Sequence, residues 1–179
     1  MKRKFSIVVL VLAVIVGGIV AFQQYRLYRT KQYSPIEHAV YNNNFINIEI
    51  AYSRPFKKDR VIFGDLVPYG EWWRTGANEA TTIRLSRDIS FSGQILKAGL
   101  YSLVTFPGEK EWDIVFNSKI PDWGTSYFPE EDVLKVKAKV EALPEVVEQF
   151  TIDFSEENGS PLLILAWDKT KVTTPFSVL

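Results

Sequence analysis

The sequence predicts an all-β fold, an antiparallel β-sandwich, preceded by one N-terminal transmembrane helix. From Phe45 onward, apolar and polar residues alternate with a period of two in several segments, and short clusters rich in glycine, proline and asparagine separate these segments. An apolar run from Phe5 to Phe22 predicts the helix. A jelly-roll arrangement is compatible with the strand pattern, and a partly closed barrel is the alternative.

Residues 5–22 are apolar apart from Ser6, and as a helix they would span roughly 27 Å, enough to cross the hydrocarbon core of a bilayer. The basic tail, residues 1–4, favours an orientation with the remaining chain on the extracytoplasmic side, in the periplasm or at the cell surface. The flank after the run, with Arg26, Arg29 and Lys31, is also basic and weakens this argument for orientation. An uncleaved anchor is preferred over a cleaved signal peptide because Ile19-Val20-Ala21 is a poor cleavage pattern.

Residues 23–44 are expected to form a stalk or linker, since Pro35 and the run Asn42–Asn44 disfavour a long helix. His38, the only histidine, lies in this segment. No second histidine exists to complete a metal pair, so we assign it no role.

Composition excludes several classes of site and partner. The chain has no cysteine, so disulfides, cysteine metal sites and a cysteine nucleophile are absent. Six of the 21 basic residues precede Tyr33, where no acidic residue occurs, so the rest of the chain has 15 basic and 21 acidic residues and a net charge of −6. An acidic domain argues against nucleic acid as a partner. The sequence predicts no cofactor, no metal and no catalytic residue.

Residues 45–179 are expected to form the β-sandwich domain, with about eight or nine strands joined by short turns and no crossover helix. The segment Val133–Val140 alternates apolar residues with lysines, which is typical of the solvated face of a sheet. The nearly continuous apolar run Leu162–Trp167 predicts a central strand that is covered on both faces. Residues 118–129 form a loop rich in aromatic residues and proline, expected to serve either as a site or as a lid over the core.

The segment Tyr69–Thr82 concentrates aromatic and polar chemistry between two glycines. An arginine beside a tryptophan can stack on the ring and still offer its donors to a carboxylate or a carbonyl. We therefore predict a ligand-binding site formed by this segment together with a tryptophan of the aromatic loop, composed of Tyr69, Trp73, Arg74, Asn78, Glu79 and Trp123.

Several blocks of the chain resemble the exported bacterial family of unknown function 2911. They include Tyr52-Ser-Arg-Pro55, Arg60-Val-Ile-Phe-Gly64, Trp73-Arg-Thr-Gly-Ala-Asn-Glu-Ala-Thr81 and Lys97-Ala-Gly-Leu-Tyr-Ser-Leu103. The resemblance runs from about Ile46 to the C-terminus. It implies a β-rich domain behind a signal or anchor, and no catalytic residue, because the family has no established activity.

Three functions fit the sequence. The first is a membrane-anchored module that binds a small polar, glycan or peptide ligand of the cell envelope. The second is a structural or protein-interaction domain, in which the segment is a buried clasp, Trp73 belongs to the core and Arg74 pairs with Glu79 or Asp65. The third is a hydrolase that uses Asp65, Glu71 and Glu79. The first two are distinguished by whether Arg74 opens into a cleft or is enclosed by protein carboxylates.

Overall fold

The computed structural model describes residues 2–179, without the side chains of residues 2–6 and 8. It divides into two compact units, Met1–Tyr33 and Ser34–Leu179.

The first unit is a single helix, α1 (Lys2–Tyr33). Its part Val9–Tyr33 is long and apolar enough to cross a membrane, by length and composition. The helix continues past Phe22, where a linker was expected, because the following residues contain neither glycine nor proline. Arg29 also donates to the hydroxyl of Tyr33 across one turn, with Nη2 2.9 Å from Oη. Pro35 follows the end of the helix, as steric restriction before proline requires.

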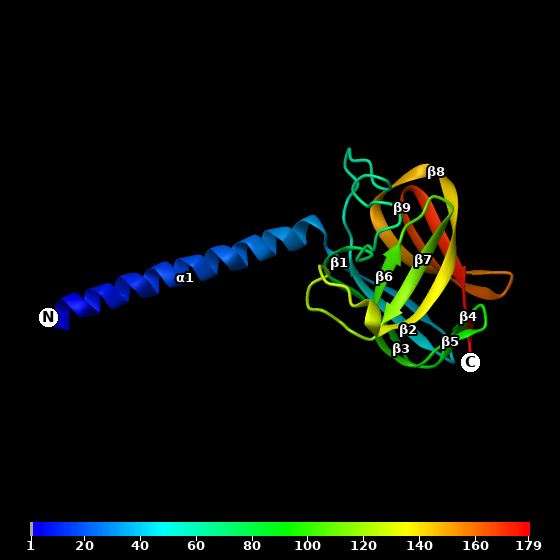
Figure 1. The fold of residues 1–179 in the computed structure, drawn as a ribbon, viewed down its shortest axis with the longest axis horizontal. Coiled ribbons are helices and arrows are strands. Elements are labelled where there is room, and N and C mark those ends of the chain that lie inside the picture. The colour runs from blue at the N-terminus through cyan, green and yellow to red at the C-terminus, as the bar shows by residue number, and fades with distance from the viewer. Residues whose placement is uncertain (1) are drawn as a thin grey trace. The chain divides into compact units, whose positions relative to one another are not determined.

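The second unit is built from antiparallel strands in a sheet of seven and a sheet of three (Figure 1). The order in the large sheet is β1-β2-β3-β6-β7-β8-β9, and in the small sheet β10-β4-β5. The strands are β1 (Ile36–Asn42), β2 (Asn47–Ser53), β3 (Ala77–Leu85), β4 (Ile89–Phe91), β5 (Gln94–Leu96), β6 (Gly99–Phe106), β7 (Glu111–Asn117), β8 (Asp132–Glu157), β9 (Ser160–Pro175) and β10 (Ser177–Val178), with a 3-10 turn, η1 (Pro129–Glu131), before β8.

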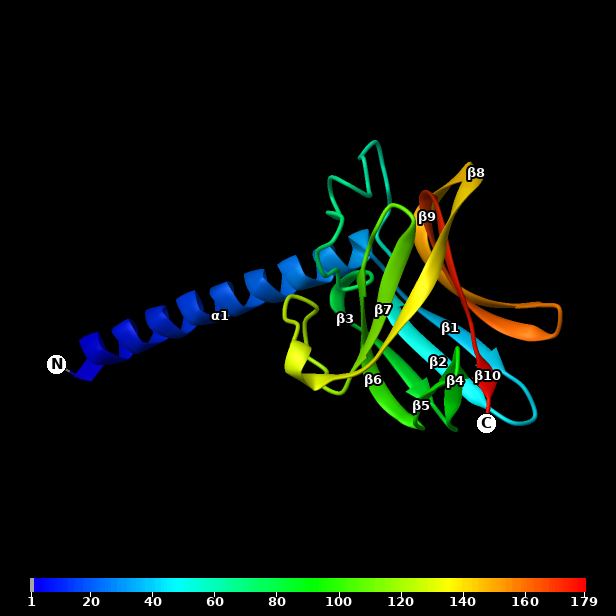
Figure 2. The same ribbon diagram turned by 45° about the vertical axis from the view of Figure 1, so that its right-hand side comes forward.

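The large sheet curls because β8 is 26 residues long and its register against β9 shifts on both sides of Val147. Its second half returns to the segment that follows β2, where the amide of Phe150 donates to the carbonyl of Pro55 at 2.9 Å. Figure 2 shows β8 and β9 running together along the curl. The prediction of an all-β, antiparallel, sandwich-like fold behind an N-terminal helix is confirmed.

The strand β1 lies within the range that was expected as a linker. It pairs with β2 over its whole length, Ala39 is buried, and Tyr41 packs against the core. The compact unit therefore begins at Ser34 and not at Phe45. The alternation in β1 is weak, because its other side chains are mostly exposed, and this explains why the pattern did not reveal it. His38 lies on β1, with Nδ1 2.7 Å from Oε1 of Glu49.

The run Leu162–Trp167 does not form a central strand. It belongs to β9, which ends the order of the large sheet and has β8 as its neighbour there. Its residues alternate between buried and half-buried, with Leu163, Leu165 and Trp167 in the core. The sequence pattern predicted that both faces of this strand are covered. In the structure one face is buried in the core, and the apolar residues of the other face are only half-buried.

The core of the second unit contains an aromatic cluster together with the aliphatic side chains of the strands. Five rings from different parts of the chain lie with centroids 4.9 to 6.2 Å apart, mostly edge to face. Trp73 stacks on Trp167 at 5.8 Å and 14°. The rings belong to Phe63, Trp73, Trp112, Phe150 and Trp167.

Candidate functional site

The adjacent tryptophans of the segment Tyr69–Thr82 point to opposite sides of the backbone. The amide of Trp73 donates to the carbonyl of Thr105 at 2.7 Å, and the reverse bond measures 2.9 Å, so this residue is extended beside β6. Successive side chains of an extended segment alternate in direction. The ring of Trp73 therefore enters the aromatic cluster, whereas Trp72 is 38% exposed and lies 5.6 Å from the ring of Tyr127.

The backbone reverses immediately after Trp73 in a tight, strained turn. Thr75 and Asn78 have positive φ angles of 55° and 57°, which side chains disfavour. Gly76 is required between them, because a Cβ there would lie 2.8 Å from the carbonyl oxygen of Ser53. Hydrogen bonds hold the turn, including one from Thr81 Oγ1 to the carbonyl of Thr75 at 2.8 Å. The position of Arg74 is thus set by a rigid backbone.

This turn leaves a break in the pairing between β3 and β6. The register joins Thr82 to Ser102, and the next pairing along β6 is the one between Trp73 and Thr105. In the described chain β3 supplies no partner for the two residues of β6 between these points. A hollow of about 260 Å³, counting space open to solvent, lies here. Its polar and aromatic lining is formed by Trp72, Arg74, Thr81, Ser102, Ser126 and Tyr127.

Arg74 is half-buried in this hollow and is the single charged residue of its lining. Across residues 2–179 its guanidinium makes neither a hydrogen bond nor an ion pair. Gly124 packs against its stem, where a Cβ would lie 2.9 Å from Cδ of Arg74. The side chain is therefore positioned by packing, and its donors are left available.

The loop between β7 and β8 forms one wall of the hollow and is pinned at its middle and at its end. The amide of Gly124 donates to the carbonyl of Asn78 at 2.9 Å. Tyr127 donates to Oδ2 of Asp132 at 2.6 Å, and Asn117 Nδ2 donates to Oδ1 of the same carboxylate at 2.9 Å. Burial raises the pKa of Tyr127 above its ordinary value of 10.0, and the hydrogen bond to Asp132 raises it further. Tyr127 therefore remains neutral, with its ring held in place.

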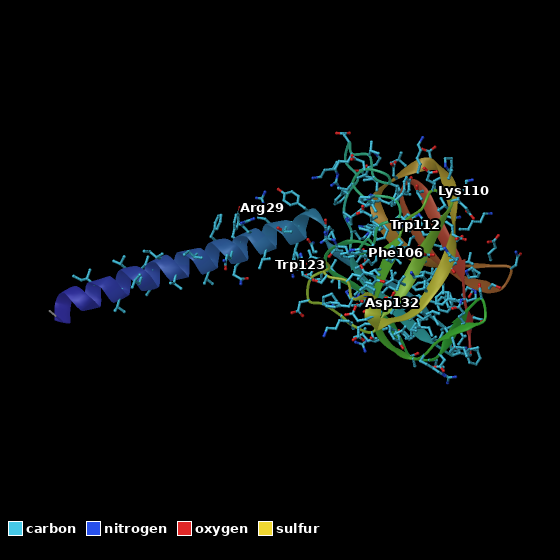
Figure 3. All side chains as sticks on the ribbon, viewed as in Figure 1. Arg29, Phe106, Lys110, Trp112, Trp123 and Asp132 are labelled. Atoms are coloured by element: carbon cyan, nitrogen blue, oxygen red, sulfur yellow. The ribbon has the colours of Figure 1, made fainter. Side chains whose placement is uncertain are left out.

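The other residues of the predicted site lie outside the lining of the hollow. Asn78 is buried, and its Nδ2 donates to the carbonyl of Ser34 at 3.1 Å, so its amide serves the fold. Glu79 is half-buried and accepts from Ser53 Oγ at 3.4 Å. Tyr69 is 43% exposed with its ring over Gly64. Trp123 is half-buried on the loop after β7, at the outer edge of the β-domain in Figure 3.

The turn and the hollow lie in a part of the chain that matches a known protein family. The family model described as "Protein of unknown function (DUF2911)" matches residues 34–176. The chain belongs to the DUF2911 family. The match begins where the second compact unit begins and includes the turn, the hollow and the aromatic cluster. Searches of curated proteins and of solved structures found no match.

The DUF2911 domain does contain an arginine clasp, but it is half-buried and lies at Arg54. Its Nε donates to the carbonyl of Phe150 at 2.9 Å and its Nη2 to Thr151 Oγ1 at 2.7 Å, while Nη1 lies 3.4 Å from a carboxylate oxygen of Glu37. The side chain of Arg54 is 23% exposed. These contacts join the end of β2 to the second half of β8, and they supply the internal pairing that the sequence had suggested for Arg74.

The carboxylates considered for hydrolysis are not gathered at the hollow. Asp65 and Glu71 are exposed, and neither they nor Glu79 line it. Within residues 2–179 no group of three or more His, Cys, Asp or Glu could hold a metal ion. The arrangement places an arginine beside two aromatic rings. The residues that the sequence prediction left out there are Tyr127 and Trp72, which form walls, and Asp132, which accepts the hydrogen bond of Tyr127. The aromatic composition of the loop was the signal for Tyr127.

Proposed function

We propose that this DUF2911 domain binds a small polar ligand, a glycan or peptide fragment of the cell envelope, in the hollow beside Arg74. One observation carries the proposal. Arg74 is half-buried and lines the hollow without a hydrogen bond or ion pair to any of residues 2–179. A partly desolvated guanidinium is stabilised by an acceptor with matching geometry, and a ligand in the hollow would supply one.

The residues around Arg74 favour a bound ligand over bulk water as the partner of its guanidinium. Trp72 and Tyr127 provide ring surface on one side, and an apolar floor is formed by residues of β6, among them Val104. Apolar surface with a few directed polar groups is typical of small-molecule sites. Most of the volume of about 260 Å³ is open to solvent, and the enclosed part holds about one water molecule, so a ligand would insert a single group beside Arg74 and keep the rest of its surface outside.

The membrane is the second partner in this proposal. The helix α1 is long and apolar enough to cross a bilayer, and the basic residues before it favour a cytoplasmic N-terminus. The β-domain would then be held on the extracytoplasmic side as an anchored module. Its net charge of −6 argues against nucleic acid.

The alternative function, a structural or protein-interaction domain, agrees with the positions of two residues. Trp73 lies in the aromatic cluster and Asn78 is buried and hydrogen-bonded, so both act in the fold. The clasp expected in this alternative has its contacts at Arg54. Arg74 and Arg54 therefore make a matched pair, one lining a hollow and the other bonded within the domain.

The test compares Arg74→Ala with Arg54→Ala in the full chain, held in lauryldimethylamine oxide micelles, a detergent without a sugar group. Melting temperature is measured alone and against a panel of cell-wall oligosaccharides and peptides. We expect Arg74→Ala to keep a melting temperature close to that of the wild type and to lose every ligand-induced shift. Arg54→Ala should lower the free energy of unfolding by about 2–3 kcal/mol, because it removes charged hydrogen bonds from a largely buried position.

A result in which Arg74→Ala destabilises the domain as much as Arg54→Ala would contradict the proposal, since it would mean that Arg74 is itself a structural clasp. A panel without any shift in the wild type would contradict it as well.

A further inference from the structure

Three of the four hydroxyl groups that line the hollow are already committed as donors, and the fourth, on exposed Ser126, makes no hydrogen bond within residues 2–179. Thr81 Oγ1 donates to the carbonyl of Thr75 at 2.8 Å, and Ser102 Oγ donates to the carbonyl of Lys119 at 2.7 Å. The hydroxyl of Tyr127 donates to Asp132 at 2.6 Å. A hydroxyl has one hydrogen and two lone pairs. These three groups can therefore offer a ligand only acceptors, and the ligand has to bring donors to meet them.

Arg74 has the opposite role. It carries donors only, it has no acceptor among residues 2–179, and no acidic residue lines the hollow beside it. The ligand must bring acceptors to this point, and a negative charge gives the strongest and shortest bonds. One arginine matches a carboxylate in a bidentate pair. The lining holds no second cation, which a phosphate group with its higher charge would favour.

The aromatic wall adds a shape requirement. The rings of Trp72 and Tyr127 lie 5.6 Å apart with an interplanar angle of 35°, and Trp72 is 38% exposed. Such a surface packs against a flat, weakly polar face of a ligand. A pyranose ring combines a carbon–hydrogen face with several hydroxyl donors at its rim, whereas a peptide terminus offers a single amide donor beside its carboxylate.

From this complementarity we infer that the ligand is an acidic sugar, a pyranose that carries a carboxylate. The carboxylate binds Arg74, the ring packs on Trp72 and Tyr127, and the ring hydroxyls donate to Thr81 and Ser102. This inference rests on the proposed binding function and names the ligand class of the same hollow.

The test uses D-glucuronate as the probe, with D-glucuronamide and D-glucose as neutral controls and alanyl-alanine as the peptide control. The full chain in lauryldimethylamine oxide micelles is labelled with ¹⁵N, and the indole signal of Trp72 is identified by its loss in Trp72→Phe. We expect glucuronate to shift the Trp72 signal. Glucuronamide should bind at least about 10-fold more weakly than glucuronate, because a charged hydrogen bond is lost. Arg74→Gln should abolish the glucuronate shift. The control Arg84→Gln, an exposed arginine on β3 outside the hollow, should not.

Three outcomes would overturn the inference. Equal binding of glucuronate, glucuronamide and glucose would show a sugar site without a carboxylate requirement, and a shift with alanyl-alanine alone would show a peptide site. Both results leave the proposed binding function standing. If none of the four probes shifts the Trp72 signal, the acidic sugar is refuted as well. The melting-temperature measurements with cell-wall oligosaccharides and peptides then test the binding function separately.

Discussion

At the scale of single residues, neighbours in the sequence have separate tasks. Trp72 and Trp73 carry the same side chain, but Trp73 packs among four other rings of the cluster and Trp72 borders the hollow. Arg54 and Arg74 divide in the same way between the fold and the hollow. The identity of a residue therefore sets its chemistry, and its position relative to other strands sets its use.

The tryptophan pair gives a direct prediction. Trp73→Ala should lower the free energy of unfolding by about 3–5 kcal/mol, since it leaves a cavity in the aromatic cluster. Trp72→Ala should change it by less than about 1 kcal/mol, because the side chain is 38% exposed. Denaturant unfolding of both variants in micelles measures the difference. Similar losses in the two variants would contradict the division of tasks.

Tyr127 predicts a dependence of stability on pH. Burial, and then its hydrogen bond to Asp132, raise the pKa of the folded state above 10.0, so the contribution is fully present below pH 10 and is lost as pH rises above it. Melting temperature should therefore fall more steeply above pH 10 in the wild type than in Tyr127→Phe, and the two curves should converge. Tyr69→Phe, in an exposed side chain, serves as the control. A constant difference from neutral to alkaline pH would contradict the prediction.

At the scale of elements, the hollow exists because β3 and the segment before it meet β6 at two separate places. The turn after Trp73 diverts the chain between these pairings, and the loop after β7 closes the side of the gap. None of these elements forms the hollow alone.

Gly124→Ala tests the role of this loop. The added Cβ would lie 2.9 Å from Arg74 Cδ and 3.2 Å from the carbonyl oxygen of Glu79, so either the arginine or the loop has to move. We expect the Trp72 indole signal to shift, ligand affinity to fall at least ~10-fold, and stability to fall by only about 1 kcal/mol, since the strain is local. Thr125→Ala, at an exposed position of the same loop, should leave both unchanged. An unchanged affinity in Gly124→Ala would show that the loop does not position Arg74.

At the scale of the whole molecule, the chain consists of an apolar helix and a DUF2911 domain that has its own core. The absence of cysteine makes the sidedness of this arrangement accessible to chemical labelling. In intact cells, Glu157→Cys on β8 should react with a membrane-impermeant maleimide, and Lys2→Cys should react only after the membrane is opened. The reverse pattern would place the domain in the cytoplasm, and recovery of a protein that begins near Phe22 would indicate a cleaved signal.

The sequence by itself determined the fold class, the apolar helix and the family, because alternation, turn residues, an apolar run and short motifs are local properties of the chain. It also singled out the segment around Arg74. It could not distinguish Arg54 from Arg74, or Trp72 from Trp73, because both members of each pair have the same chemistry and burial is decided by strands distant in sequence. It also missed β1, because the alternation of apolar and polar residues there is weak and the strand is defined by its pairing with β2.

Only the tertiary structure decided that Arg74 lines a hollow, that Asn78 is consumed by the fold, and that Tyr127 and Asp132 complete the wall. The physical reason is that hydrogen-bond partners and solvent exposure depend on which segments meet in space. The curl of one long sheet brings the second half of β8 back to the end of β2, where it binds Arg54. On the same sheet, the break between β3 and β6 leaves the donors of Arg74 available for a ligand.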